Sequence, residues 1–216
     1  MKNYLSHHLL VILFLISSNV LAQEQEGTYK VTFNSKGQKI SFISGDIAKL
    51  SSVKSFNAIL EPQHYAMGIK GEADTVYINK KVKELNAKKA GRGDDWEKEW
   101  KTTTSHFLPA FVEGYNDYIE KSNIPKIVEI ENETSQKSCT MALKLIFLYT
   151  YIDSPRIGLY LDIYSNENKN DTIMHLLLNI QWYNNSKKYP GANTGAFFTA
   201  GRVLGKYFEK DIFKDK

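Results

Sequence analysis

The chain has 216 residues, of which 12% are aromatic and 24% charged, and its formal net charge is +4 at pH 7. A charge this small, with lysine and glutamate interspersed, argues against a nucleic-acid surface, which needs a concentrated basic face. Thirteen tyrosines indicate a filled hydrophobic core rather than a disordered chain. The single cysteine, Cys139, cannot form an internal disulfide, so the sequence predicts a domain that is stabilised by packing alone.

The first 22 residues have the pattern of a cleavable secretory signal peptide. Lys2 supplies the positive charge, residues 9–16 form the apolar segment, and Val20 and Ala22 are the small residues before the cleavage site. The apolar segment is shorter than the roughly 20 residues of a transmembrane helix, and no later stretch is apolar enough to span a bilayer. We therefore expect export to the periplasm or the exterior, cleavage after Ala22, and one domain over residues 23–216.

Strand patterns open the mature sequence. Residues 29–33 alternate between apolar and polar side chains, residues 34–37 have turn chemistry, and residues 40–42 resume the alternation. This pattern predicts an N-terminal β-hairpin. Residues 56–60 are a candidate third strand, which Pro62 ends.

Helical spacing follows from residue 75. A first helix is expected to end at Gly91, and Asp94 is expected to cap a second helix that runs to about residue 124. The inward stripe of that second helix consists of Trp96, Trp100, Phe107, Phe111 and Tyr118. Pro109 predicts a kink, although the threonines at 102–104 leave open two helices that meet near Ser105.

The second half is rich in strands. A short strand is expected at 127–130, and three long strands at 139–152, 157–164 and 173–183 form a meander because short loops join them. A helix from about residue 195 closes the chain, with Gly201 and Gly205 expected to bring it close to the sheet. The predicted fold class is α+β, with an antiparallel sheet, made of the N-terminal hairpin and the meander, and helices packed on one face.

Two sequence patterns carry a resemblance over about two-thirds of the chain. Residues 93–96 (GDDW), with Trp100 and Phe111 after them, precede the meander, and residues 201–208 (GRVLGKYF) follow it. This arrangement resembles small exported proteins of Bacteroidetes that carry domains of unknown function. Its layout is also similar to the α/β domain of outer-membrane accessory lipoproteins and the amino-terminal domain of TolB, although no lipid-bearing cysteine follows the leader. The resemblance implies an accessory role in the periplasm or at the cell surface, and it transfers no catalytic residue.

No motif for catalysis or for a cofactor stands out. The histidines and the cysteine lack the spacing of metal ligands, there is no glycine-rich phosphate loop, and there is no G-x-S-x-G element. We therefore predict no metal, no cofactor and no catalytic residue. A nucleophilic Cys139 is an alternative, but a lone thiol at the head of an apolar strand is usually buried and inert. Sugar stacking on Trp96 and Trp100 is another, but their helical spacing with Phe107 favours burial in the core.

Alternation along the meander indicates a candidate binding face. One set of alternate residues is almost wholly apolar and is expected to lie under the helices: Met141, Leu143, Leu145, Phe147, Ile157, Leu159, Leu161, Ile163, Met174, Leu176, Leu178 and Ile180. The other set, which includes Ile146 and Leu148, is mixed. Aligning the apolar residues places Asp162 directly opposite His175, with Lys144 one strand away on the same face.

The candidate binding residues on this mixed face are Lys144, Tyr160, Asp162, Tyr164, His175 and Asn179. Two interpretations remain: the N-terminal hairpin packs on this face, or the face binds a ligand or a partner. The leading hypothesis for function is a non-enzymatic accessory protein, periplasmic or secreted, that binds a partner protein of the envelope or another envelope component. A secreted hydrolase with a dispersed acid/base site and a small-ligand carrier are the alternatives.

Overall fold

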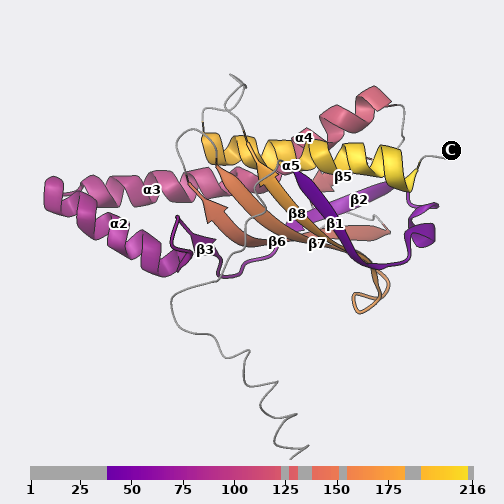
Figure 1. The fold of residues 1–216 in the computed structure, drawn as a ribbon, viewed down its shortest axis with the longest axis horizontal. Helices are drawn as coiled ribbons and strands as arrows, with labels where there is room; N and C mark the ends of the chain where they lie inside the picture. Colours follow the sequence, from indigo (N-terminus) through magenta and orange to yellow (C-terminus); the bar gives the residue numbers. More distant parts are fainter. Residues whose placement is uncertain (1–37, 123–126, 131–137, 151–154, 183–190, 214–216) are drawn as a thin grey trace, which may run out of the picture.

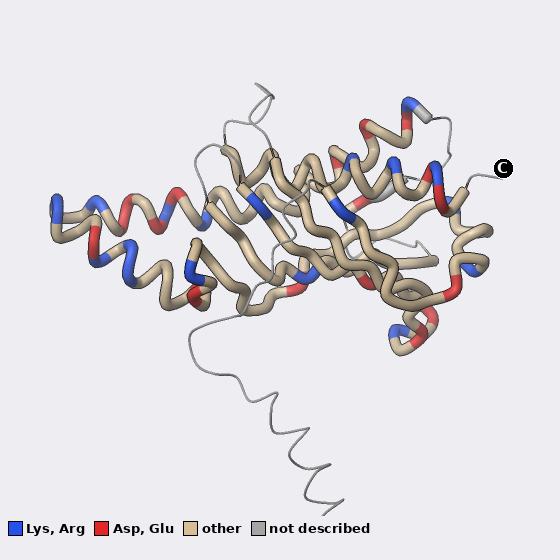
Figure 2. The backbone as a smooth tube through the Cα atoms, viewed as in Figure 1, with Lys and Arg blue, Asp and Glu red and all other residues tan. Residues whose placement is uncertain are grey.

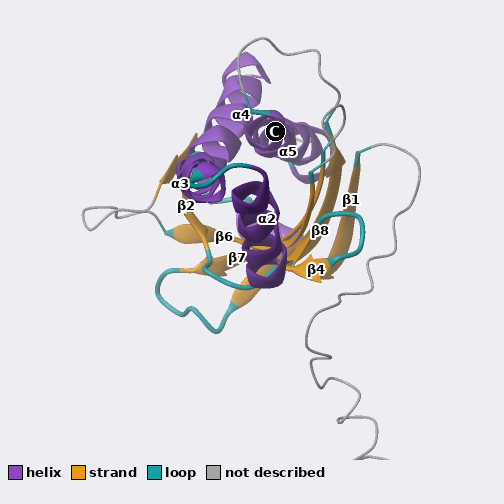
Figure 3. Cartoon of the chain, turned by 90° about the vertical axis from the view of Figure 1, so that its left-hand side faces the viewer, coloured by secondary structure: helices purple, strands orange, loops and turns teal. Residues whose placement is uncertain are grey.

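A computed structural model describes residues 38–122, 127–130, 138–150, 155–182 and 191–213 of the chain. Eight strands form one sheet, with helices packed on one of its faces (Figures 1 and 3). The strands are β1 (Lys39–Gly45), β2 (Ser55–Leu60), β3 (Ala66–Met67), β4 (Glu72–Ala73), β5 (Ile127–Ile130), β6 (Cys139–Tyr149), β7 (Arg156–Ser165) and β8 (Thr172–Gln181). The helices are α2 (Asp74–Lys88), α3 (Arg92–Ser105), α4 (Phe107–Ser122) and α5 (Ala192–Tyr207), with short helical segments η1 (Ile47–Leu50) and η2 (Phe208–Ile212).

The α+β class and the meander are confirmed. Strand β7 pairs antiparallel with both β6 and β8, so the three strands that follow one another in sequence are neighbours in the sheet. The apolar side chains of these strands face α4 and α5, and Met141, Leu161 and Leu176 are almost completely buried there. Burial of these apolar side chains stabilises the fold.

The sheet is mixed, however: the predicted antiparallel strands, β1 and the meander, are joined by strands that pair in parallel. Its strand order is β1-β8-β7-β6-β2-β5, and β2 runs parallel to both of its neighbours, β5 and β6. The physical reason is the long connection: α2, α3 and α4 lie between β2 and β5, and a connection of that length returns the chain to the starting edge of the sheet. Strand β3 also pairs parallel with β6 and antiparallel with β4.

The described residues test only the second half of the predicted N-terminal hairpin. Residues 29–37 lie outside the described residues, as does the leader at 1–22. The second expected strand exists as β1, and it pairs antiparallel with β8 at the edge of the sheet. In the described residues β1 therefore extends the sheet and does not cover its mixed face.

The junction between α3 and α4 resolves the alternatives that the sequence left open. Helix α3 ends at Ser105 and α4 begins at Phe107, so two helices meet there and no single kinked helix forms. Thr103 Oγ1 donates to the carbonyl of Glu99 (2.9 Å) and Ser105 Oγ donates to that of Thr102 (2.7 Å), and such bonds compete with a continuous helix. Pro109 lies in the first turn of α4, where proline is tolerated, so the predicted kink is wrong.

Gly201 and Gly205 of α5 face helix α4 and not the sheet, which corrects the expectation for these two residues. A Cβ atom on Gly201 would lie 2.0 Å from the carbonyl oxygen of Phe111, and one on Gly114 would lie 2.0 Å from that of Phe198. Helices α4 and α5 therefore touch backbone to backbone.

Aromatic side chains fill the layer between the helices and the sheet. The rings of Phe107 and Phe197 stack with their centroids 4.2 Å apart, and Trp100 meets Phe107 edge-on at 6.3 Å. Trp100 is only 8% exposed, as its spacing predicted, while Trp96 is half-buried against it. Tyr118, which was assigned to the inward stripe, is also half-buried, and Tyr115 takes the core position.

No helix among the described residues has both the length and the apolarity to cross a membrane.

Candidate functional site

The face of the sheet opposite α4 and α5, here called the open face, carries the second set of alternate residues. Asp162 of β7 lies directly opposite His175 of β8, as the alternation of the two strands predicted. Lys144 of β6 lies opposite Tyr160 of β7, one pair along the same face. Three neighbouring strands thus bring a lysine, an aspartate, a histidine and a tyrosine together.

These side chains are bonded to one another. Lys144 Nζ donates to Asp162 Oδ2 at 2.8 Å, and His175 Nδ1 is hydrogen-bonded to Asp162 Oδ1. Lys144 Nζ also lies 3.4 Å from Glu61 Oε2, and the ring of Tyr160 stacks on that of His175 with centroids 5.1 Å apart. We call Glu61, Lys144, Tyr160, Asp162 and His175 the polar cluster.

Asp162 is the centre of the polar cluster. Burial alone would raise the pKa of its carboxyl group, but the hydrogen bonds and charges of Lys144 and His175 lower that pKa below its ordinary value. The hydrogen bond to Asp162 raises the pKa of Lys144, against the effect of desolvation and together with the charges of Asp162 and Glu61. The carboxylate and the ammonium group are therefore both charged across the neutral range.

The polar cluster is partly accessible. The Asp162 side chain is 15% exposed, those of His175 and Lys144 are 25% and 32% exposed, and Tyr160 is exposed at the outer side of the cluster. Because Asp162 takes its hydrogen bond from His175 Nδ1, the other ring nitrogen, Nε2, is not used in that bond. This arrangement can offer a partner an aromatic surface, a cation and an imidazole N–H or lone pair.

Two of the six candidate residues lie apart from the cluster. Tyr164 is one pair further along β7, opposite Thr140, and is buried. Asn179 is half-buried at the other end of β8, opposite Gly158 of β7 and Lys39 of β1, with Leu177 between it and His175. The structure therefore gathers Lys144, Tyr160, Asp162 and His175, and leaves Tyr164 and Asn179 as flanking residues.

A β-bulge in β6 corrects the assignment of two side chains. The pairing of β6 with β7 shifts between Leu145 and Phe147, so one extra residue changes the side on which the following side chains lie. Phe147, expected under the helices, pairs with Gly158 on the open face, and a Cβ atom on that glycine would lie 2.1 Å from the Phe147 ring. Leu148 takes the place in the core instead and is fully buried.

The sequence did not predict two residues at this site, Glu61 within the polar cluster and Ser44 beside it. Glu61 reaches Lys144 because β2 runs parallel to β6, and its backbone N–H donates to the carbonyl of Leu143 (2.9 Å). Ser44 lies opposite His175 because β1 pairs with β8. Only the pairing of distant strands reveals either residue, so no local sequence pattern indicated them.

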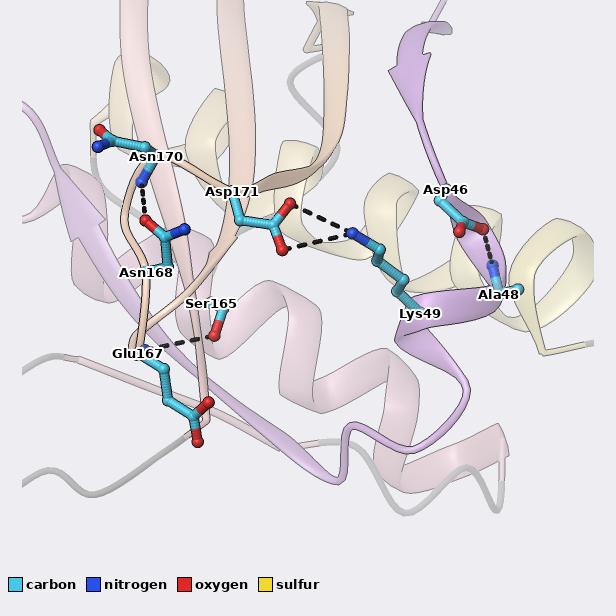
Figure 4. Close-up of polar contacts among 8 residues, drawn as sticks. All are labelled: Asp46, Ala48, Lys49, Ser165, Glu167, Asn168, Asn170 and Asp171. Carbon is cyan, nitrogen blue, oxygen red and sulfur yellow. Dashed lines mark hydrogen bonds and ion pairs between the residues drawn. The ribbon is translucent and has the colours of Figure 1, made fainter.

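The turn between β7 and β8 is fixed to the segment that follows β1, at the far end of this face (Figure 4). Lys49 Nζ contacts both carboxylate oxygens of Asp171, at 3.2 and 3.3 Å, and the side chain of Asp46 caps η1 by accepting from the N–H of Ala48 at 3.0 Å. The N–H of Asp46 donates to the carbonyl of Ile173 (2.8 Å). These contacts hold β1 beside β8 and so fix Ser44 and His175 relative to each other.

The remaining chemical candidates do not form a second site. Cys139 is buried, as expected for a structural cysteine. Asp94 does not cap α3, because the helix begins two residues earlier, after Gly91, and Asp94 accepts from Asn86 Nδ2 at 3.2 Å instead. Within the described parts of the chain, no three histidine, cysteine or acidic side chains are grouped as metal ligands would be.

No family model matches the chain, and no curated protein matches it in sequence. Among solved structures it is similar to the PelC dodecamer from Paraburkholderia phytofirmans, with a TM-score of 0.38 and 9% sequence identity over 79% of this chain and 94% of the PelC chain. A variant of the same PelC matches with a TM-score of 0.37 and 10% identity over the same shares. At this level of similarity nothing about PelC transfers to the present chain.

Proposed function

We propose that this protein is an exported, non-enzymatic binding protein of the bacterial envelope, and that its open face binds a partner protein. The signal-peptide pattern of residues 1–22 supports export, with cleavage after Ala22. In that case the mature chain begins at Gln23, and the intact mass of the exported protein tests this directly. A mass that includes Met1 would contradict the proposed location.

The observation that carries the binding role is the polar cluster itself. Its five side chains come from three regions of the chain: the residue after β2, strand β6, and the β7–β8 pair. They are linked by hydrogen bonds, an ion pair and a ring stack. Tyrosine is enriched at protein interfaces, and Tyr160 is exposed at the outer side of this cluster. Because β1 extends the sheet at its edge, the described residues of β1 leave this surface available.

One observation favours the alternative of a hydrolase. One row of paired residues crosses three strands: Asp162 of β7, His175 of β8 and Ser44 of β1. A hydrolase needs its acid, its base and its nucleophile in this order. The described contacts include no hydrogen bond between Ser44 and His175, so the binding role has the stronger support. Hydrolysis of p-nitrophenyl acetate by the wild type that is lost in both Ser44→Ala and His175→Ala would reverse this preference.

The binding role is tested by site-specific photo-crosslinking in cells that produce the protein. A photoreactive phenylalanine replaces the exposed Tyr160 on the open face, and the matched control places it at the exposed Lys206 of α5, on the side of the helices. We expect a defined crosslinked protein at position 160 that is absent at position 206. The same product at both positions, or none at position 160, would contradict the proposal.

A further inference from the structure

Helices α2 and α3 form a hairpin that extends beyond the ends of the strands (Figure 1). We call residues 78–99 of this hairpin the arm. Helix α2 packs chiefly on α3 and on the short strands β3 and β4, and none of its residues is buried. It nevertheless has an apolar stripe, Ile78, Val82 and Leu85, and each of these side chains is half-buried. A helix that packs on the body of a protein normally buries such a stripe, so this one is incompletely covered.

The outer end of the arm is held in place. The side-chain oxygen of Asn86 accepts from the backbone N–H of Gly93 at 2.7 Å, and its amide nitrogen donates to Asp94 Oδ1 at 3.2 Å. These two bonds join the last turn of α2 to the first turn of α3. The partial exposure of the stripe is thus a property of a fixed hairpin and not of a frayed end.

Unpaired charges of opposite sign border the stripe. On α2, Lys81 lies four residues before Leu85, and Lys88 lies three residues after it. At these spacings both lysines are neighbours of Leu85 on the helix surface. On α3, Asp95 and Glu99 lie one turn apart beside the half-buried Trp96. Among the described residues none of these four charged side chains forms an ion pair, whereas Glu97 on the same helix pairs with Lys101 at 2.8 Å.

The helical periodicity places both borders on the same side of the arm. The carbonyl of Val82 and the side chain of Asn86 lie against Gly93 of α3, so this side of α2 faces α3, and Leu85 lies about a quarter turn from it. On the antiparallel α3, Trp96 and Glu99 turn toward that same side. One side of the arm therefore has an apolar centre, lysines along the α2 border and acids along the α3 border; Figure 2 shows both signs of charge on these two helices.

We propose that this side of the arm binds the same side of the arm in a second copy of the chain. In a symmetric pair the α2 border of each copy meets the α3 border of the other, so Lys81 and Lys88 face Asp95 and Glu99 twice. The reverse arrangement, with α2 on α2, would oppose lysine to lysine. The pairing would also cover Leu85 and Trp96. This surface is separate from the open face, so the proposal does not depend on the proposed function.

Sedimentation velocity over a range of protein concentrations tests the pairing with two charge-reversal variants, Lys81→Glu/Lys88→Glu and Asp95→Lys/Glu99→Lys. We expect the wild type to form a dimer that weakens as salt rises, and each variant alone to be monomeric because its borders then carry one sign of charge. An equimolar mixture of the two variants should form a heterodimer. The control Lys206→Glu/Lys210→Glu has the same change of charge on exposed residues outside the arm and should dimerise like the wild type.

A monomeric wild type at every concentration would overturn the proposal, as would variants that dimerise unchanged or a mixture that does not associate. The thermal unfolding of each variant shows whether its fold is retained. If a charge-reversal variant unfolds early, Leu85→Asp tests the same side independently of the charged borders. A folded Leu85→Asp protein that still dimerises as tightly as the wild type would equally overturn the proposal.

Discussion

Neighbouring residues on β7 meet two different environments. Leu159, Leu161 and Ile163 point toward the helices and are at most 1% exposed, while Tyr160 and Asp162 between them reach the open face and contact His175. On the covered face the volume and shape of the side chains determine whether the fold is stable. On the open face particular polar groups meet with specific geometry. The same strands therefore provide stability on one side and a candidate binding surface on the other.

The largest difference is expected between a buried aromatic side chain and an exposed one at the edge of the sheet. Phe197 is fully buried and stacks on Phe107, so Phe197→Ala should lower the free energy of unfolding by about 3–5 kcal/mol. Phe42 at the edge of the sheet is 45% exposed, and Phe42→Ala should lower it by less than about 1 kcal/mol. Urea unfolding measures both values, and equal losses would show that α5 does not cover the core as described.

Two adjacent residues of β7 give a closer comparison. Leu161→Ala leaves a cavity under the helices and should lower the free energy of unfolding by about 2–5 kcal/mol. Tyr160→Ala removes a ring that is 36% exposed and should have an effect of about 1 kcal/mol or less. If Tyr160→Ala proved the more damaging of the two in the same urea experiment, the open face would be structural.

Asp162 should show a smaller, pH-dependent effect. Asp162→Asn removes the charge that Lys144 and His175 stabilise, and should lower the free energy of unfolding by about 1–3 kcal/mol at pH 7. The pKa of Asp162 is lowered by folding, so the contribution of its charge is present above the ordinary aspartate pKa and is lost as the pH falls through the lower folded value. The difference between wild type and variant should therefore shrink below about pH 4. A difference that grew on acidification would mean that the carboxyl group is protonated in the folded protein.

The sequence was sufficient where neighbours in sequence are also neighbours in space. Short loops and strict alternation fixed the register of β7 on β8, so the sequence alone placed Asp162 opposite His175. The burial of Trp100 followed from helical spacing in the same way.

Features that depend on distant segments were not predictable in this way. Nothing local indicates that β2 lies parallel beside β6, and without that pairing Glu61 cannot be assigned to Lys144. The bulge in β6 depends on packing, because the Phe147 ring lies where any side chain at position 158 would be, and it exchanged the faces of Phe147 and Leu148. The α3–α4 junction likewise depends on side-chain bonds of Thr103 and Ser105 that compete with the helix.

The central claim is that the polar cluster serves binding rather than folding. The most direct measurement is the yield of the crosslink at position 160 in the triple variant Lys144→Met, Asp162→Val, His175→Leu. Of the cluster's charges only that of Glu61 then loses its partner, and its side chain is 34% exposed to water, so the free energy of unfolding should stay within about 1 kcal/mol of the wild type. In that folded protein we predict that the crosslinked product is lost. A crosslink of unchanged yield in the folded triple variant would contradict the account.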